Sequence, residues 1–380
     1  MSWSFRLLTI KGIPVRIHAS FLLVLVAAAV SGLMSGHDDW LRSSAFMVIL
    51  VLLLFVCVVL HELGHSLVAQ RYGVQVQDIT LWPIGGVARL SRLPNRPHQE
   101  FLITAAGPAT NLALAVLLGA LAVTWIGPDP MLRLLADPRL LNRFLAAQEI
   151  RPLVLLLAVN NLILALFNLI PAFPMDGGRL LRSLLAVFLP FRRATQLAAL
   201  LGQALAVLMA IAGLLTGNFF LGLVGVFVFI AAWQERRQTL IHESLKGVVV
   251  RQAIRPIGLR LNPGLSLGQA AAQAAAAPQT AYLVVDGNRL TGVLFREDLL
   301  SAVRKAGPAA SITPYLRRST LRLRPEETLD LALERITQGR TGFALVVDNG
   351  QVIGTISQTD LLRLAEILGA HPGALREAGQ

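Results

Sequence analysis

Two imidazoles and a carboxylate stand together in His61-Glu62-Leu63-Gly64-His65, at a spacing that suits metal-assisted hydrolysis. On a helix, residues four apart share a face, so His61 and His65 can direct their rings toward one metal ion. Glu62 lies one residue further round the helix, where it can take a proton from a metal-held water without being a ligand. The pattern predicts a zinc site with Glu62 as the general base.

The segment that carries these residues is unusually apolar. Residues 46–60, which precede His61 directly, are as hydrophobic as a bilayer span. An H-E-x-x-H string can arise by chance on any helix. Here the chance interpretation would bury two histidines and a glutamate in lipid without a shared partner, at several kcal/mol. Ionisable residues at such a position favour a functional site inside a membrane.

Composition supports a membrane protein with several spans. The 380 residues are 54% hydrophobic and only 15% charged, and the mean hydropathy is +0.62, whereas soluble domains carry about 25% charged residues. The long apolar runs end near residue 233, which predicts an all-α polytopic membrane domain over residues 1–233 and a different, soluble domain beyond it. Six spans are expected, centred on Ile17–Met34, Ser44–Leu67, Phe101–Ile126, Leu153–Ile170, Gln196–Thr216 and Phe219–Trp233.

The net charge of +12 is explained by membrane topology and not by nucleic-acid binding. Arginines follow the even-numbered spans: Arg71 after the second, Arg179 and Arg182 after the fourth, and Arg236 after the sixth. The positive-inside rule then places both termini in the cytoplasm of a multi-pass protein of the cell membrane. The first apolar run lacks a small-residue cleavage site, so no separate signal peptide is expected.

A third zinc ligand is needed, because catalytic zinc sites usually have three protein ligands and an open water position. Asp176 is the best candidate, since Pro171 and Pro174 break the helix before it and Gly177 and Gly178 allow a sharp turn and close approach. We expect Asp176 on non-helical backbone at membrane depth, which is tolerated where it is buried in protein or lines a watered cavity. The predicted topology brings it to the depth of the histidines.

The order of these motifs resembles the site-2 protease family of intramembrane zinc metalloproteases, peptidase family M50. The similarity covers about residues 1–235 and consists of the His61–His65 motif, Gly107-Pro-Ala-Thr-Asn111, and the segment from Asn168 to Gly178. It implies zinc bound by His61, His65 and Asp176, Glu62 as general base and later acid, and a transmembrane peptide as substrate.

The resemblance also implies supporting roles for five residues. Asn168 would hold the substrate or an oxyanion, or else form a helix–helix hydrogen bond. Asn111 would order the site from a neighbouring helix, with Gly107 permitting close packing. Gly85 and Gly86 would belong to an extended edge that holds an unwound substrate by strand addition, or to an ordinary interfacial turn.

Two further residues have simpler interpretations. His18 could be a polar group near the site, but a histidine at the start of a helix is favoured. Cys57 lies one turn before His61, and a packed apolar thiol is more common there than a metal ligand.

An internal repeat occupies the polar half of the chain. Leu283-Val-Val-Asp286 recurs as Leu345-Val-Val-Asp348, and Asp298-Leu-Leu300 recurs as Asp360-Leu-Leu362, both at an offset of 62 residues. Each unit reads helix, strand, tight turn, strand, helix, and resembles one half of a tandem pair of CBS (cystathionine-β-synthase) domains. We therefore predict a connector over residues 234–247, CBS domains over 248–306 and 307–370, and a tail over 371–380, giving a cytosolic α+β module.

CBS pairs often bind adenine nucleotides, which implies ATP or a related nucleotide as a second ligand. In the second unit Ser357 and Asp360 match the family's phosphate and ribose contacts; in the first, Asp298 is present but Phe295 replaces the hydroxyl. Both acids could instead cap the helices that follow them. A structural pair, or one that forms a homodimer, is the alternative to nucleotide binding.

The leading interpretation is a zinc metalloendopeptidase that cleaves transmembrane segments of single-span proteins, regulated through the CBS pair. CBS pairs also occur on ion carriers, but repeated halves with broken helices are not obvious here. A pseudo-enzyme is disfavoured because His61, Glu62, His65 and Asp176 are all intact.

Overall fold

The computed structural model describes residues 3–34, 39–83, 85–90, 96–277, 279–287, 289–318, 320–339 and 342–370. The predicted tail over 371–380 lies outside these residues. The chain divides into two compact units, Met1–Arg236 and Arg237–Gln380. Each unit is described by itself.

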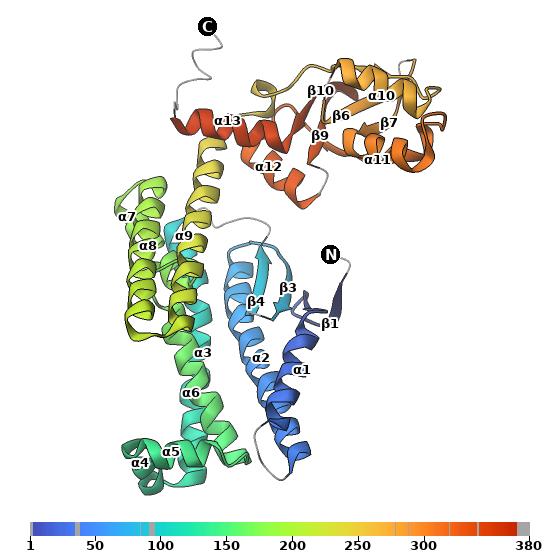
Figure 1. Cartoon of the computed structure of the whole chain (residues 1–380). Coiled ribbons are helices and arrows are strands. Elements are labelled where there is room, and N and C mark those ends of the chain that lie inside the picture. Colours follow the sequence, from blue (N-terminus) through green and yellow to red (C-terminus); the bar gives the residue numbers. More distant parts are fainter. Residues whose placement is uncertain are drawn as a thin grey trace. The chain divides into compact units, whose positions relative to one another are not determined.

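Long apolar helices dominate the first unit (Figure 1). Five helices in the described residues are long and apolar enough to cross a membrane: α2 (Trp40–Arg71), α3 (Pro97–Ile126), α6 (Ile150–Asn168), α8 (Phe191–Thr216) and α9 (Phe219–Leu245). This confirms the predicted helical membrane core. The expected first span is shorter: α1 is Phe21–Leu33, with 13 residues, because Ile17 and His18 belong to a strand.

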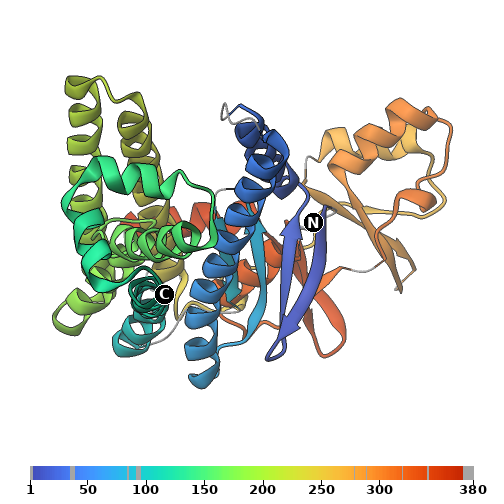
Figure 2. The ribbon, with the colours of Figure 1, turned by 90° about the horizontal axis from the view of Figure 1, so that it is seen from below.

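A four-stranded sheet adds to this helical core and was not predicted as a whole. Its order is β1–β2–β3–β4, formed by Ser4–Ile10, Ile13–His18, Val76–Trp82 and Gly85–Leu90. β2 and β3 are parallel, with Val15 opposite Ile79, and the outer pairs are antiparallel. The sheet lies beside α2 (Figure 2). β4 is an edge strand, so alternate N–H and C=O groups of its outer side are unpaired within the sheet.

Three short helices complete the first unit. α4 (Pro128–Ala136) and α5 (Pro138–Leu145) follow α3 and pack against α6 through a cluster that includes Met131 and Leu155. A turn over residues 169–175 separates α6 from α7 (Asp176–Phe188). The break before Asp176 is as predicted, but the expectation of non-helical backbone at Asp176 itself is wrong. Met175 is the N-cap, so Asp176 is the first residue of the new helix.

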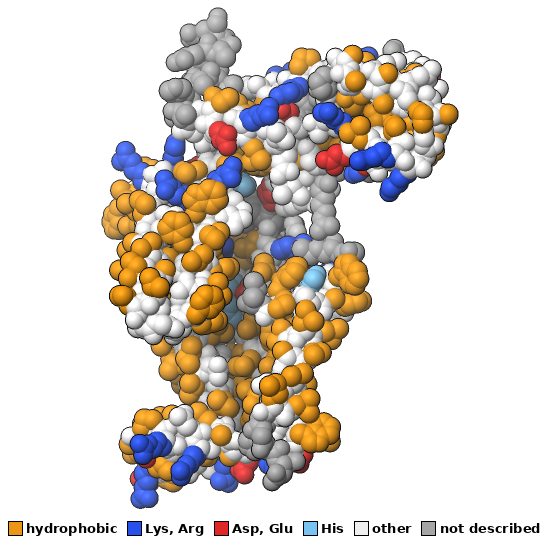
Figure 3. All heavy atoms as spheres, viewed as in Figure 1, with side chains coloured by type: hydrophobic (Ala, Val, Ile, Leu, Met, Phe, Trp, Pro, Cys, Tyr) orange, Lys and Arg blue, Asp and Glu red, His pale blue; other side chains and the backbone are white. Residues whose placement is uncertain are grey.

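The surface of the helical unit suits a bilayer. Figure 3 shows hydrophobic side chains covering its long helices, with Lys and Arg gathered at the two ends. Large apolar residues on these helices are widely exposed; Val116 is 69% exposed, Leu208 62% and Ile230 55%. Soluble proteins rarely expose so much contiguous apolar surface, so these faces belong in lipid.

The second unit contains two copies of one αβ pattern. The first copy is β5 (Arg260–Leu261), α10 (Leu267–Ala276), β6 (Ala281–Asp286), β7 (Arg289–Phe295) and α11 (Arg296–Ala306). The second is β8 (Leu321–Leu323), α12 (Leu329–Gln338), β9 (Phe343–Asp348), β10 (Gln351–Ser357) and α13 (Gln358–Ala370). The helix–strand–turn–strand–helix prediction is confirmed, and each copy begins with a short additional strand.

The two copies exchange their leading segments. Arg255, which precedes the first copy, pairs with Thr355 of the second, and Arg317, which precedes the second, pairs with Val293 of the first. Residues of these segments also enter the opposite cores: Val250 packs with the second copy and Ile312 with the first. The exchange joins the two copies into one module.

Candidate metal centre

Three donor atoms converge at the inner side of α2. The Nε2 atoms of His61 and His65 are 3.1 Å apart, and Asp176 Oδ2 lies 3.3 Å from the first and 3.2 Å from the second. Among the described residues, this is the group of three that could hold a metal ion. The structure thus brings the three predicted ligands together from helices more than a hundred residues apart in sequence.

The donor set fits zinc. Ligands at about 2.0–2.1 Å on a tetrahedral ion lie about 3.3 Å from one another, which matches all three separations. Asp176 Oδ2 is buried with no hydrogen-bond partner among the described residues, as expected for an oxygen reserved for a metal. His65 Nδ1 is 2.8 Å from the carbonyl oxygen of Ile103; this contact fixes the ring and leaves Nε2 to face the site.

α3 approaches α2 closely where the histidines lie. A Cβ added to Gly107 would collide with His65 Nε2 and would lie 2.8 Å from His61 Cε1. At Gly64 on α2, a Cβ would lie 2.8 Å from the carbonyl oxygen of Ala106. The two glycines therefore let the helices pack at this distance, and Gly107 leaves the space that the imidazoles need.

The Glu62 side chain extends from α2 toward the edge strand β4. Its Oε2 accepts a hydrogen bond of 3.2 Å from the backbone N–H of Ala88 on β4. A Cβ at Gly86 would lie 2.8 Å from Glu62 Cγ, so this glycine gives the carboxylate its room. Ala88 and Gly86 are two residues apart on one strand, so both present their outer backbone groups on the side of Glu62.

The edge strand is anchored by a buried ion pair. Asp78 of β3 is 5% exposed and accepts from Arg89 of β4, with 2.7 Å between Arg89 Nε and Oδ1. Thr80 Oγ1 donates to the same oxygen at 3.2 Å, and Arg16 Nε of β2 is 3.7 Å from Oδ2. These contacts across three strands hold β4 in register beside Glu62.

The turn that presents Asp176 folds tightly over the start of α7. A Cβ at Gly177 would collide with the carbonyl oxygens of Leu169 and Ile170, and one at Gly178 would lie 2.6 Å from the nitrogen of Phe173. The predicted close approach at these two glycines is therefore present. It makes the position of Asp176 depend on the whole turn.

The predicted supporting residues differ in how they lie. Asn111 is fully buried one turn after Gly107, and neither its Oδ1 nor its Nδ2 has a hydrogen-bond partner among the described residues. Asn168 donates to the carbonyl oxygen of Leu164 in its own helix at 3.0 Å, a backbone contact that neither predicted role anticipated. Gly85 has a φ of +142° and open space around its Cβ position.

The simpler interpretations of His18 and Cys57 agree with their contacts. His18 Nδ1 lies 2.7 Å from Ser20 Oγ at the start of α1, and its ring stacks on Trp82 at 4.0 Å. Cys57 is buried, and its sulfur accepts from Asn161 Nδ2 at 3.2 Å.

Arg182 follows the fourth expected span, but it lies on α7 and not in a solvated loop. Arg182 is fully buried and is paired with Glu100 and Glu235. The available signal was its position six residues after Asp176, on a helix that must pack against the bundle.

Ser357 and Asp360 in the second copy form a reciprocal helix cap. Asp360 N donates to Ser357 Oγ at 3.2 Å, and Ser357 N donates to Asp360 Oδ2 at 3.3 Å. Arg255 Nη2 also lies 2.6 Å from Asp360 Oδ1. The alternative of a capping role is therefore present in the structure, together with a guanidinium that was not predicted.

The first copy repeats the ion pair without the hydroxyl. Asp298 Oδ2 accepts from Arg317 Nε at 2.9 Å, and the Arg317 guanidinium lies 4.6 Å from the centroid of the Phe295 ring. Phe295 is 7% exposed and packs edge-on against Phe343. An aromatic contact between the copies thus occupies the place of the missing hydroxyl.

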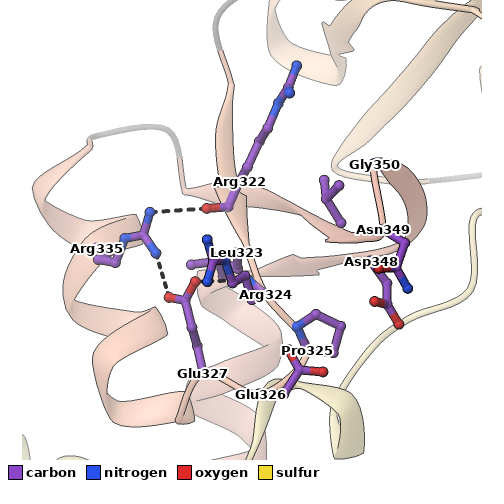
Figure 4. Close-up of a pocket in the computed structure, with 11 residues that line it drawn as sticks. Arg322, Leu323, Arg324, Pro325, Glu326, Glu327, Arg335, Asp348, Asn349 and Gly350 are labelled. Carbon is purple, nitrogen blue, oxygen red and sulfur yellow. Dashed lines mark hydrogen bonds and ion pairs between the residues drawn. The ribbon is translucent and has the colours of Figure 1, made fainter.

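A pocket of about 680 Å³ lies elsewhere on the second copy. Figure 4 shows Arg335 bound to Glu327 and to the carbonyl oxygen of Arg322, while the Arg322 side chain points away from them. The residues that line this pocket include both basic and acidic side chains, but neither Ser357 nor Asp360.

Two histidines and a non-ligating glutamate on an apolar helix, joined by an aspartate from another helix, are typical of a membrane-embedded metallohydrolase. Comparison with known proteins agrees. The sequence profile of Peptidase family M50 matches residues 49–209, and that of the CBS domain matches residues 312–366.

Curated relatives align with nearly the whole chain. A zinc metalloprotease of Methanocaldococcus jannaschii is 32% identical over 369 residues, covering 97% of this chain and 98% of that protein. Rip3 of Mycobacterium tuberculosis is 31% identical over 392 residues, covering 94% and 92%. A solved site-2 protease from M. jannaschii aligns at 39% identity and a TM-score of 0.43, covering 62% of this chain and 95% of that one. The chain belongs to peptidase family M50, the site-2 protease type of zinc metalloprotease, and carries CBS domains.

Proposed function

We propose that this protein is an intramembrane endopeptidase that cleaves the transmembrane segments of single-span membrane proteins. The observation that carries the proposal is the triangle of His61, His65 and Asp176, with sides of 3.1–3.3 Å, on helices suited to a bilayer. Both termini lie in the cytoplasm, because arginines follow the even-numbered apolar segments.

The residues of the site have different roles in the proposed reaction. His61, His65 and Asp176 would hold the zinc, which when bound would activate a water for attack where bulk water is scarce. Glu62 is placed to accept a proton during attack and to return it to the leaving amine. Asn111 is buried one turn after Gly107, and its amide has no hydrogen-bond partner among the described residues; it would order the site from α3.

The substrate is held as an added strand on β4. A peptide bond within a transmembrane helix is protected by its own hydrogen bonds, so the substrate must unwind before attack. The outer edge of β4 offers backbone groups on the side of Glu62, as the bond from Ala88 N–H to Glu62 indicates. Strand addition would pair the unwound peptide with this edge and bring its carbonyl groups to the catalytic carboxylate.

The test compares three variants of the full-length protein. Glu62→Gln removes the base and keeps the shape, so hydrolysis should fall by several orders of magnitude while zinc stays at about one per chain. His65→Ala should lose most of the zinc. Stoichiometric zinc in a His61→Ala, His65→Ala double variant, or near-normal cleavage by Glu62→Gln, would refute the assignment. Single-span proteins that accumulate with the Glu62→Gln form identify the substrate.

The CBS module senses an adenine nucleotide in its second copy. Ser357, Asp360 and Arg255 provide a hydroxyl, a carboxylate and a guanidinium within one cluster, which suits phosphate and ribose. A ligand shifts activity only if it binds one arrangement of the protein better than another. The helix α9, which continues from the apolar segment to Leu245 in the core of the second copy, is the route for this effect.

A further inference from the structure

A buried ion triad joins α3, α7 and α9. Arg182 is 0% exposed and Glu100 is 5% exposed. The Arg182 guanidinium donates to Glu100 Oε1 through Nε at 2.9 Å and also through Nη2, and its Nη1 donates to Glu235 Oε1 at 3.2 Å. Buried ion pairs add little net stability compared with apolar side chains of similar volume. The placement of this guanidinium is better explained by an effect on the position of neighbouring residues than by an effect on stability.

The guanidinium contacts the turn that carries Asp176. It lies 5.3 Å from the ring centroid of Phe173 and 5.1 Å from that of Phe191, a geometry suited to cation–π attraction. Phe173 is fully buried three residues before Asp176. Gly178, in the first turn of α7, packs so closely against the backbone nitrogen of this phenylalanine that a Cβ would lie 2.6 Å from it. A displaced Phe173 would therefore displace Asp176.

One face of α9 belongs to the same apolar clusters as the turn. Val228 shares a cluster with Ala172 and Met175, and Ala232 shares one with Phe173. Glu235 follows Ala232 by three residues, so the face that joins these clusters also presents the carboxylate to Arg182.

We propose that Arg182 is a positioning residue for the metal site. Its fork of donors and its stacking on Phe173 fix the turn that presents Asp176, and Glu235 makes this position depend on α9. The inference rests on the proposed role of Asp176 as a zinc ligand. Loss of the fork should loosen Asp176 and change the metal's coordination, because residues behind metal ligands typically contribute 10–100-fold in affinity.

The experiment measures metal binding in the full-length protein. Arg182→Met should lower zinc affinity by about 10–100-fold in competition with a chelator, and should alter the absorption spectrum of the cobalt-substituted protein. Arg182→Lys keeps the charge without the planar fork and should shift the spectrum in the same direction by less. Arg193→Met removes an exposed arginine from α8 and should leave both readouts unchanged.

A triple variant in which the triad is uncharged distinguishes an effect on the metal site from a failure to fold. Arg182→Met alone takes the guanidinium away from the buried Glu100 and the half-buried Glu235 and could unfold the protein, whereas Glu100→Gln, Arg182→Met, Glu235→Gln together remove the charges of all three side chains. Weak zinc binding and an altered cobalt spectrum in this folded triple variant would support the proposal. Wild-type affinity and spectrum in it, or in Arg182→Lys, would overturn it. Asp176→Ala tests the ligand separately: if that variant keeps its zinc, the proposed metal site itself fails.

Discussion

At the scale of single residues, the site depends on space as much as on ligands. The imidazoles of His61 and His65 fill the volume that a side chain at Gly107 would occupy. Glu62 likewise uses the room left by Gly86. The proposed chemistry therefore needs glycine at two positions, Gly86 and Gly107, as well as the four functional side chains.

Gly107→Ala should remove zinc. Its Cβ would collide with His65 Nε2, so the ring must leave its position and one ligand is lost, which we expect to weaken zinc binding by at least tenfold. Gly119→Ala, on the same helix with no atom within 4 Å of its Cβ position, is the matched control. Metal analysis after dialysis against a chelator distinguishes them. Equal zinc contents would show that α3 can yield at Gly107 without cost.

Residues differ in how far their roles could be predicted from sequence. His61 and His65 were predictable because a spacing of four on one helix is a local rule, and Asp176 because prolines and glycines around it signal a break. Arg182 was not, since its partner Glu100 lies 82 residues away and a buried arginine has the same local pattern as an exposed one. The hydrogen bond of Asn168 to its own helix was not predictable either, because the motif identifies the residue but not its contacts.

At the scale of elements, β4 connects the sheet to Glu62. The parallel pairing of β2 with β3 joins residues 64 apart, such as Val15 and Ile79. No local pattern predicts that pairing, so the sheet was missed although its glycine-rich edge was noticed. Asp78 and Arg89 then hold the edge strand at Glu62.

Ala88→Pro should weaken substrate binding more than metal binding. Proline removes the N–H that now donates to Glu62, and edge strands tolerate proline, so the sheet should persist. We expect kcat/KM for a transmembrane substrate to fall by about tenfold, the effect of losing about 1.4 kcal/mol, with zinc content unchanged. Ala88→Gly keeps the N–H and serves as control. Cleavage by the proline variant at the wild-type rate would argue against strand addition at this position.

Gly178→Ala tests the turn that presents Asp176. The new Cβ would lie 2.6 Å from the Phe173 nitrogen, and because the contact is with backbone, the turn must shift. Activity should drop strongly and the thermal midpoint should fall, since overpacking typically costs about 1–3 kcal/mol. Gly222→Ala on α9 meets no atom within 4 Å and should change neither. A Gly178→Ala protein with normal turnover would mean that the turn is more adaptable than its packing indicates.

At the scale of the whole molecule, one helix belongs to both units. Residues 219–233 of α9 are apolar and lie within the first unit, while Leu245 is fully buried in the core of the second CBS copy. The sequence predicts a polar connector with helix-like charge after residue 233, and α9 continues through it as far as Leu245. Polar residues such as Gln234 and Arg236 suit a solvated helix as well as a flexible linker, so their pattern does not show where the helix ends.

Nucleotide binding should depend on the second CBS copy far more than on the first. Asp360 is bonded to Ser357 and Arg255, whereas Asp298 has Arg317 and the apolar ring of Phe295. Asp360→Ala in the full-length protein should weaken ATP binding at least tenfold by calorimetry and change the nucleotide dependence of cleavage, with zinc content unaltered.

The matched control for that prediction is Asp298→Ala, which breaks the equivalent ion pair in the first copy. Each variant loses one carboxylate, and Asp360→Ala also loses one side of the helix cap, at a cost of about 1 kcal/mol. If the two variants weaken ATP binding equally, the cause is a general loosening of the module and not a contact with the nucleotide. If ATP, ADP and AMP all fail to bind the wild-type protein at millimolar concentrations, the CBS pair has a structural or dimerising role, and any signal through α9 must begin with another ligand.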